Sequence, residues 1–155
     1  MEKSLILIKP DAIQRGLAGR VLARFEAKGL KIVALKMIQL DTEILVDHYS
    51  HIADKPFFKG IADFMKKTPV IALILEGLDC VDTVRRLCGI TKAREAQVGT
   101  IRGDFAMSIQ TNVVHASDSV ENAQKEINRF FKEEEIFDYP LVLTEFTYSV
   151  DEISG

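Results

Sequence analysis

The sequence lacks any hydrophobic stretch that is long enough to cross a membrane as a helix. Its longest uninterrupted apolar run, residues 70–75, ends at Glu76, whereas a spanning helix needs about 20 apolar residues. The first residues also lack the basic and then apolar pattern of a secretory signal. We therefore expect a cytoplasmic protein.

Cysteine is scarce, and basic charge is not in excess. The two cysteines, Cys80 and Cys88, fall in a predicted helix, where they would lie about 12 Å apart, too far for a disulfide. Their spacing is not that of a zinc site, so we expect two free thiols. The formal net charge of −3 argues against a surface that binds a nucleic acid backbone.

Several sequence motifs of common enzymes are also absent. There is no Walker loop, no glycine-rich dinucleotide fingerprint, no nucleophile elbow and no H-E-x-x-H zinc motif. What is present is a chain of 155 residues, 47% hydrophobic and 28% charged, which suits one globular domain. A phosphate site in this chain has to be built without a Walker loop.

The apolar pattern alternates between strand and helix periodicity. Strands are expected at residues 4–8, 30–40, 70–75 and 105–114. Helices are expected at residues 19–28, 41–49, 57–67, 79–87 and 118–131. Asp41 and Thr42 are candidate N-caps, and Asp118 with Glu121 has the spacing of a capping box. This order predicts one α/β domain, an α+β sandwich of the ferredoxin-like split βαβ type, with a four-stranded antiparallel sheet covered by helices.

Two segments do not fit this pattern. Residues 90–105 show no clear periodicity, and a loop of that length inside a compact domain is often functional. The tail over residues 140–150 alternates only weakly. It is either an extra strand or an arm that packs on a neighbouring subunit.

His115 is the leading candidate for a catalytic group. It follows an apolar strand and precedes a helix start, where unpaired N–H groups and the helix dipole favour anions and a neutral imidazole. Such a histidine is typical of a nucleophile that accepts phosphate. An isolated histidine at a strand end is usually inert, but Ser117 and Asp118 adjoin this one. Glu126, two turns into the helix, can hold one ring nitrogen and fix the tautomer.

Several other side chains indicate a binding site only when they are considered together. Lys9, Arg85 and Arg102 are each typical of a solvated surface when taken alone, although arginine also suits bidentate contact with phosphate. Phe57 and Phe58 are core residues by default. One of them, at a helix start, can instead stack on a nucleotide base.

His48 and His51 lie three residues apart in a predicted helix. That spacing allows two ligands of a metal site, but no nearby cysteine or third histidine completes it. We therefore expect a partly exposed helix face.

Six short motifs, taken in their order along the chain, resemble those of the nucleoside diphosphate kinase family over about Lys3 to Tyr139. They are Ile8-Lys9-Pro10-Asp11, Arg24-Phe25-Glu26, His48-Tyr49, Lys55-Pro56-Phe57-Phe58, Gly99-Thr100-Ile101-Arg102-Gly103-Asp104-Phe105 and Asn112-Val113-Val114-His115-Ala116-Ser117-Asp118-Ser119. The resemblance implies a kinase domain over residues 1–139. Residues 140–155 are then a C-terminal extension of the same domain and a possible subunit-contact arm.

The resemblance implies that the γ-phosphoryl of a nucleoside triphosphate, typically ATP, passes to a nucleoside diphosphate through a phosphohistidine at His115, with broad base specificity. Glu126 and Ser117 would orient His115, with Lys9 and Tyr49 close to it. The residues implied to bind the nucleotide are Lys9, Phe57, Ile61, Arg85, Thr91, Arg102, Ile109 and Asn112.

The resemblance also implies a cofactor and an assembly. Family members use Mg²⁺, bound mainly to the nucleotide phosphates, and Asp118 is the candidate to hold it through water. A homo-oligomer is expected, a hexamer in preference to a tetramer. The alternative is a nucleotide-binding or regulatory protein of the same fold with incidental phosphotransfer, which would not need the nucleophile.

The chain departs from the family pattern in one loop. Ile90-Thr91-Lys92-Ala93 stands where the family usually has Ala-Thr-Asn-Pro, and Val98-Gly99-Thr100 stands where it has Pro-Gly-Thr. The loss of two prolines predicts a looser loop. His51 also stands where an acidic residue is common.

Overall fold

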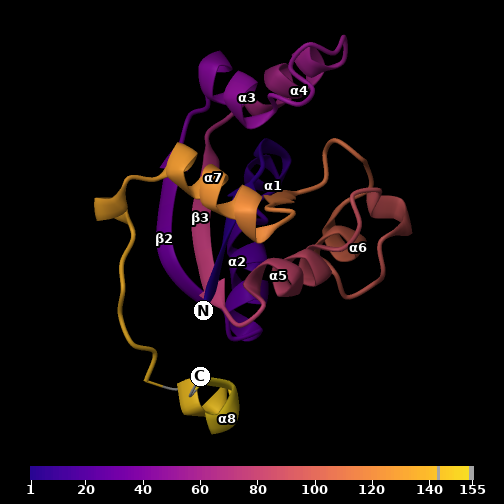
Figure 1. Cartoon of the computed structure of the whole chain (residues 1–155). Helices are drawn as coiled ribbons and strands as arrows, with labels where there is room; N and C mark the ends of the chain where they lie inside the picture. Colours follow the sequence, from indigo (N-terminus) through magenta and orange to yellow (C-terminus); the bar gives the residue numbers. More distant parts are fainter. Residues whose placement is uncertain (143, 154–155) are drawn as a thin grey trace.

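The computed structural model describes residues 1–142 and 144–153, and its centre is a four-stranded sheet (Figure 1). The strands are β1 (Glu2–Ile8), β2 (Lys31–Ile38), β3 (Val70–Gly77) and β4 (Val114–Ala116). Their order across the sheet is β2-β3-β1-β4, and all three pairings are antiparallel. This order is that of the ferredoxin-like fold, as the sequence predicted.

Helices connect and cover the strands. The α-helices are α1 (Pro10–Gln14), α2 (Ala18–Ala27), α3 (Thr42–His48), α4 (Phe58–Met65), α5 (Cys80–Cys88), α6 (Ile101–Phe105), α7 (Val120–Phe130) and α8 (Val150–Ile153). Short 3-10 turns lie at Ala93–Glu95, Glu133–Glu135 and Thr144–Phe146. Among the described residues, none of these helices has the length and apolar character to cross a membrane.

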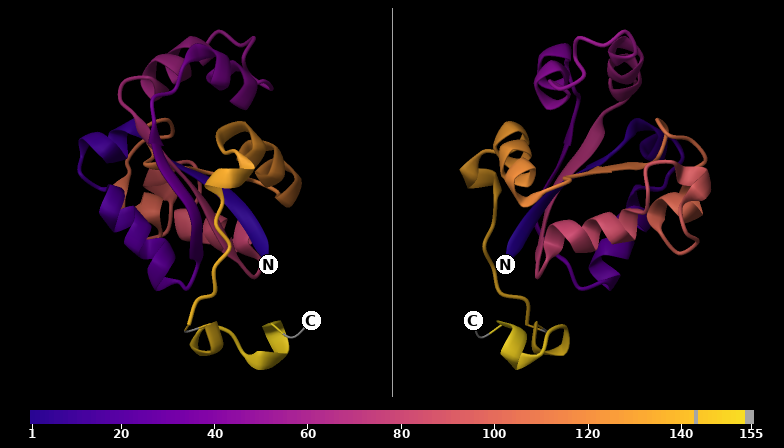
Figure 2. Two further views of the ribbon diagram at one scale, coloured as in Figure 1. Left: turned by 90° about the vertical axis from the view of Figure 1, so that its left-hand side faces the viewer. Right: turned by 45° about the vertical axis from the view of Figure 1, so that its right-hand side comes forward.

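The central strand β1 is buried on both faces because helices pack on both sides of the sheet. Alternate side chains of a strand point to opposite faces, so Leu5 and Leu7 join one apolar cluster with α3, α4 and α7. Ile6 and Ile8 join another cluster with α2, α5 and α6. Figure 2 shows α7 and α5 on opposite sides of the strands.

Helix caps agree with the sequence in one case and differ in another. The Asp41 carboxylate accepts a hydrogen bond from the Ile44 N–H at 2.9 Å, which confirms Asp41 as the N-cap of α3. Helix α7 is capped by Ser119, which accepts from the Asn122 N–H at 3.1 Å, so the predicted capping box at Asp118 is wrong. Asp118 instead accepts from the Asn122 side chain at 2.7 Å.

The expected strand over residues 105–114 is also wrong. Its first residue ends α6, and β4 has only three residues. Val113, directly before β4, has a φ of +74°, which extended backbone does not adopt. Pro10 opens α1, where its fixed φ suits a first helical position.

Both cysteines lie on α5, within the described part of the chain, where they are buried and form no disulfide, as predicted. Burial raises the pKa of the Cys80 and Cys88 thiols to about 12. They therefore pack as small apolar side chains and are not reactive thiolates.

The chain after α7 runs along the edge strand β2 and ends below the sheet (Figure 1). The Phe137 N–H donates to the Val33 carbonyl at 2.8 Å, and the Tyr139 hydroxyl donates to the Ile32 carbonyl at 2.5 Å. Beyond residue 140 the described part of the tail holds a 3-10 turn and α8, so the extra strand is wrong. Residues 143, 154 and 155 of the predicted extension lie outside the described residues.

Candidate active site

A cleft of about 910 Å³ gathers the predicted site residues. Those that line it are Lys9, Tyr49, Phe57, Ile61, Arg85, Thr91, Arg102, Ile109, Asn112, His115, Asp118 and Glu126. Ser117 lies behind the wall, fully buried, and reaches the cleft only through Glu126. One cleft thus brings together side chains from Lys9, directly before α1, to Glu126 of α7.

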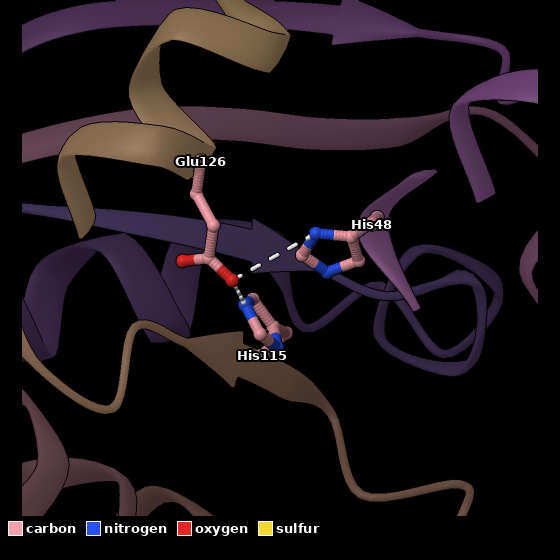
Figure 3. A group of neighbouring side chains, drawn as sticks. All are labelled: His48, His115 and Glu126. Atoms are coloured by element: carbon pink, nitrogen blue, oxygen red, sulfur yellow. Dashed lines mark hydrogen bonds and ion pairs between the residues drawn. The ribbon is translucent and has the colours of Figure 1, made fainter. Parts of the chain in front are cut away.

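His115 is held by a chain of hydrogen bonds, and Figure 3 shows the first of them, to Glu126. Its Nε2 lies 2.8 Å from Oε1 of Glu126. The other carboxylate oxygen, Oε2, accepts from the Ser117 hydroxyl at 2.5 Å, and that hydroxyl accepts from the Leu5 N–H at 3.1 Å. Both carboxylate oxygens therefore have a fixed partner.

The charge of Glu126 decides the tautomer of His115. Burial alone would raise the pKa of the Glu126 carboxyl, but its interactions with His115 and Ser117 outweigh the burial and hold that pKa below its usual value. An ionised carboxylate only accepts, so Nε2 of His115 carries the hydrogen. The lone pair then resides on Nδ1, which is the nitrogen that can attack.

Local structure explains why these two residues meet. In the β1–β4 pairing His115 stands opposite Leu7, so its side chain points to the sheet face that α7 covers. The Ser119 cap fixes where α7 begins, and Glu126 then falls two turns into the helix. The sequence interval of eleven residues therefore becomes a direct contact.

Lys9 is a buried cation between β1 and α1, at the N-cap of α1. Its ammonium donates to the Gln110 carbonyl at 2.5 Å and to Oδ1 of Asn112 at 2.8 Å. Burial lowers the pKa of Lys9 to about 8, although the Asp11 carboxylate opposes this shift. Asn112 in turn donates to the Ile109 carbonyl at 2.8 Å.

Arg102 ties the irregular segment to β4. Its two terminal nitrogens donate to the carbonyls of Gly89, at 2.6 Å, and Val114, at 2.8 Å. Its Nε is buried and has no partner among the described residues. Gly103 beside it approaches the Gln97 carbonyl so closely that no Cβ would fit. Residues 90–105 therefore line the cleft through Thr91 and Arg102.

The outer wall of the cleft is apolar and open. Phe57 and Ile109 are 58% and 57% exposed, and Ile61 lies between solvent and core. Phe58 is buried in the apolar cluster that Leu5 and Leu7 form with α3, α4 and α7, as a core residue should be, whereas Phe57 is not. An exposed aromatic ring at a cleft mouth suits stacking on a base.

Two site residues were missed from the sequence. His48 was expected on an exposed face with His51, but α3 ends at His48, whose side chain is buried, and His51 lies in the turn beyond. Arg129 of α7 lines the same cleft. His48 adjoins Tyr49 in one of the six motifs, which was the available signal. Burial raises the pKa of Tyr49 to about 12, with a further contribution from Glu126.

Asp118 offers the cleft one carboxylate that suits Mg²⁺. Its hydrogen bond with Asn122 lowers its pKa, so it is ionised at neutral pH, and it is exposed at the edge of the cleft. Protein sites for Mg²⁺ use one or two carboxylates, several waters and substrate phosphates. The residues present therefore fit a metal that arrives with a nucleotide.

Known proteins match the chain over nearly its whole length. Residues 2–136 match the family described as nucleoside diphosphate kinase. A nucleoside diphosphate kinase of Parabacteroides distasonis is 51% identical over 152 residues, covering 98% of this chain and 99% of the relative. One from Methanothermobacter thermautotrophicus is 49% identical over 148 residues, covering 96% and 99%. These alignments extend into the C-terminal tail.

Solved structures give the same result. The structure of a halophilic nucleoside diphosphate kinase from Halobacterium salinarum in complex with CDP has a TM-score of 0.92 and 39% sequence identity, covering 95% of this chain and 98% of that one. An apo nucleoside diphosphate kinase from Encephalitozoon cuniculi has a TM-score of 0.91 and 41% identity, covering 96% of this chain and 100% of that one. The chain therefore belongs to the nucleoside diphosphate kinase family, and its activity is that of a nucleoside diphosphate kinase, a phosphotransferase.

Proposed function

We propose that this kinase transfers phosphate in two steps through a phosphohistidine on His115. The observation that carries the proposal is the hydrogen-bonded chain from Ser117 through Glu126 to Nε2 of His115. In the first step Nδ1 forms a bond to the γ-phosphorus of a nucleoside triphosphate, and the bond to the bridging β–γ oxygen breaks. The diphosphate leaves, and a second diphosphate takes the phosphoryl group by the reverse step.

The remaining cleft residues position the phosphates and balance their charge. Lys9, Arg85 and Arg102 supply cations around the cleft that holds His115, while Thr91, Asn112 and Tyr49 add polar groups. Phosphoryl transfer needs positioning and electrostatic stabilisation more than further covalent chemistry. Mg²⁺, held through water by Asp118 and directly by the phosphates, would neutralise part of the phosphate charge.

Broad base specificity follows from the apolar outer wall. Phe57, Ile61 and Ile109 offer a stacking surface, which accepts any base because every base has a π-face. The Halobacterium salinarum relative, solved with the pyrimidine nucleotide CDP, is consistent with a site for more than purines.

We also propose a homo-oligomer, a hexamer in preference to a tetramer, in the cytoplasm. Two observations support assembly. The first is that Leu35 and Met37 on the edge strand β2 are about half exposed, at 49% and 58%. The second is that Val142 and Phe146 of the tail are exposed to 89% and 80%. Exposed apolar groups gathered at an edge and an arm favour contact with further copies.

Incubation with γ-labelled ATP and Mg²⁺, followed by GDP, tests the two-step transfer. We expect an acid-labile, alkali-stable phosphoprotein that GDP discharges as labelled GTP. His115→Ala should remove the label entirely. No label on the unaltered protein, or full label on His115→Ala, would overturn the mechanism.

A further inference from the structure

His48 is a buried imidazole in the cleft for which the proposed transfer has no use. Its ring makes edge-to-face contacts with three others: His115 and Tyr49 at 4.6 Å between ring centroids, and Phe130 at 5.2 Å. These contacts come from the end of α3, from β4 and from α7. His48 therefore restrains the position of the His115 ring directly.

His48 has a contact with Arg129 that favours one of its two neutral tautomers. Its Nδ1 lies 3.4 Å from a terminal nitrogen of Arg129, which can only donate, so this Nδ1 carries a lone pair. Arg129 is itself held by an ion pair with Asp47. Burial lowers the pKa of His48 to about 3, and the neighbouring His115 contributes to this shift. The ring is thus neutral at any working pH.

The same nitrogen of His48 also lies near the carboxylate that orients the nucleophile. Its Nδ1 is 3.7 Å from Oε1 of Glu126, the same oxygen that accepts from His115 at 2.8 Å (Figure 3). A nitrogen that donates at that place would compete with His115 for Oε1. A nitrogen without a hydrogen cannot.

We propose that His48 is a positioning residue that reserves the Glu126 carboxylate for His115, by packing against the His115 ring and by presenting to Oε1 a nitrogen that cannot donate. The proposal rests on the proposed phosphorylation of His115. It predicts that phosphorylation of His115 is faster with an apolar ring at residue 48 than with a polar amide of similar length. A residue that acted through hydrogen bonds alone would show the reverse order.

The test compares His48→Gln with His48→Phe in rapid-quench phosphorylation by γ-labelled ATP and Mg²⁺. The amplitude counts active sites, and the rate constant at saturating ATP reports the chemistry at each site. The Gln amide can donate to Oε1, so we expect its rate constant to fall about tenfold or more, with the apparent Kd for ATP within about twofold. His48→Phe should stay within about threefold of the unaltered protein. Glu43→Gln, an exposed substitution on the same helix, is the matched control.

Each other outcome has a definite meaning. If His48→Gln keeps the original rate constant, or if His48→Phe is the slower variant, the proposal is wrong. A loss of amplitude with unchanged rate constants would show a structural role only and also overturn it. Where the His48→Phe variant does not fold, His48→Leu provides the same comparison with less volume. If the unaltered protein carries its label elsewhere than His115, it is the proposed function that fails.

Discussion

The surroundings of His115 and the C-terminal tail differ in the side chains that they bury and expose. Around His115 the carboxylate of Glu126 and the hydroxyl of Ser117 are buried, and each has a partner within one chain. In the tail Val142, Phe146 and Val150 are apolar and 70% to 89% exposed. The first region finds these partners within this chain, whereas the second presents apolar surface that the proposed assembly would cover.

This difference predicts that changes near His115 act on chemistry and that changes in the tail act on assembly. After the loss of His115 itself, the largest effect should come from Glu126→Gln. The amide can offer an N–H to the ring in place of a carboxylate and so permits the wrong tautomer. Loss of a charge-assisted hydrogen bond corresponds to a fall of about 10- to 100-fold in the rate constant of phosphorylation, measured by rapid quench.

The matched control for Glu126 lies on the same helix. Glu121→Gln removes an exposed carboxylate that pairs with Lys125, and it should leave the rate constant unchanged. Equal loss in both variants would show that α7 as a whole, rather than the carboxylate at residue 126, sets the rate.

The burial of Lys9 predicts a smaller effect that depends on pH. Its pKa of about 8 means that the free protein loses this cation as the pH rises from 7 to 9, and that the KM for ATP should rise several-fold over this range. The folded pKa lies below the unfolded value, so the unfolded chain binds more protons between pH 8 and 10.5. Lys9 alone therefore makes folding more favourable as the pH rises through that window.

Steady-state kinetics between pH 6.5 and 9.5 measure the effect. Lys9→Met should have a raised KM at pH 7 that no longer changes across this range. A KM that rises with pH equally in Lys9→Met would assign the titration to a different group.

The smallest effect on chemistry should come from truncation after Tyr139. We expect sedimentation to show smaller species than the full chain forms, because exposed apolar groups of the arm are lost. The rate constant per active site should stay the same, since His115 and its partners all lie upstream. An unchanged mass and melting temperature would make the tail a dispensable extension.

Sequence patterns predicted three of the four strands, because apolar strands carry their own signal. The strand at 70–75 and the helix at 79–87 were each placed within two residues of β3 and α5. Helix α6 and the three-residue β4 were missed, because side-chain caps and a left-handed Val113 define them rather than periodicity. Such features depend on contacts that a local pattern does not contain.

The site shows the same division. His115 stands in one of the six motifs, Glu126 follows from its position two turns into the helix, and the phosphate-binding candidates follow from the family resemblance. The structure places them around one cleft. His48 was missed, because a histidine near a helix end is usually exposed. Only the tertiary structure shows that three other rings pack against it. The loop without the two family prolines is stabilised by other interactions. Asp104 accepts a hydrogen bond from the Gly99 N–H at 2.8 Å and forms an ion pair with Arg24. Whether it is looser than in relatives stays a prediction.

The central claim is that Glu126 selects the nitrogen of His115 that reacts. The direct measurement is the isomer of phosphohistidine in the trapped phosphoprotein, determined by ³¹P NMR after mass spectrometry has located the phosphorylated residue. The account predicts one modified residue, His115, with phosphorus on Nδ1. Phosphorus on Nε2, or on any other residue, would contradict it.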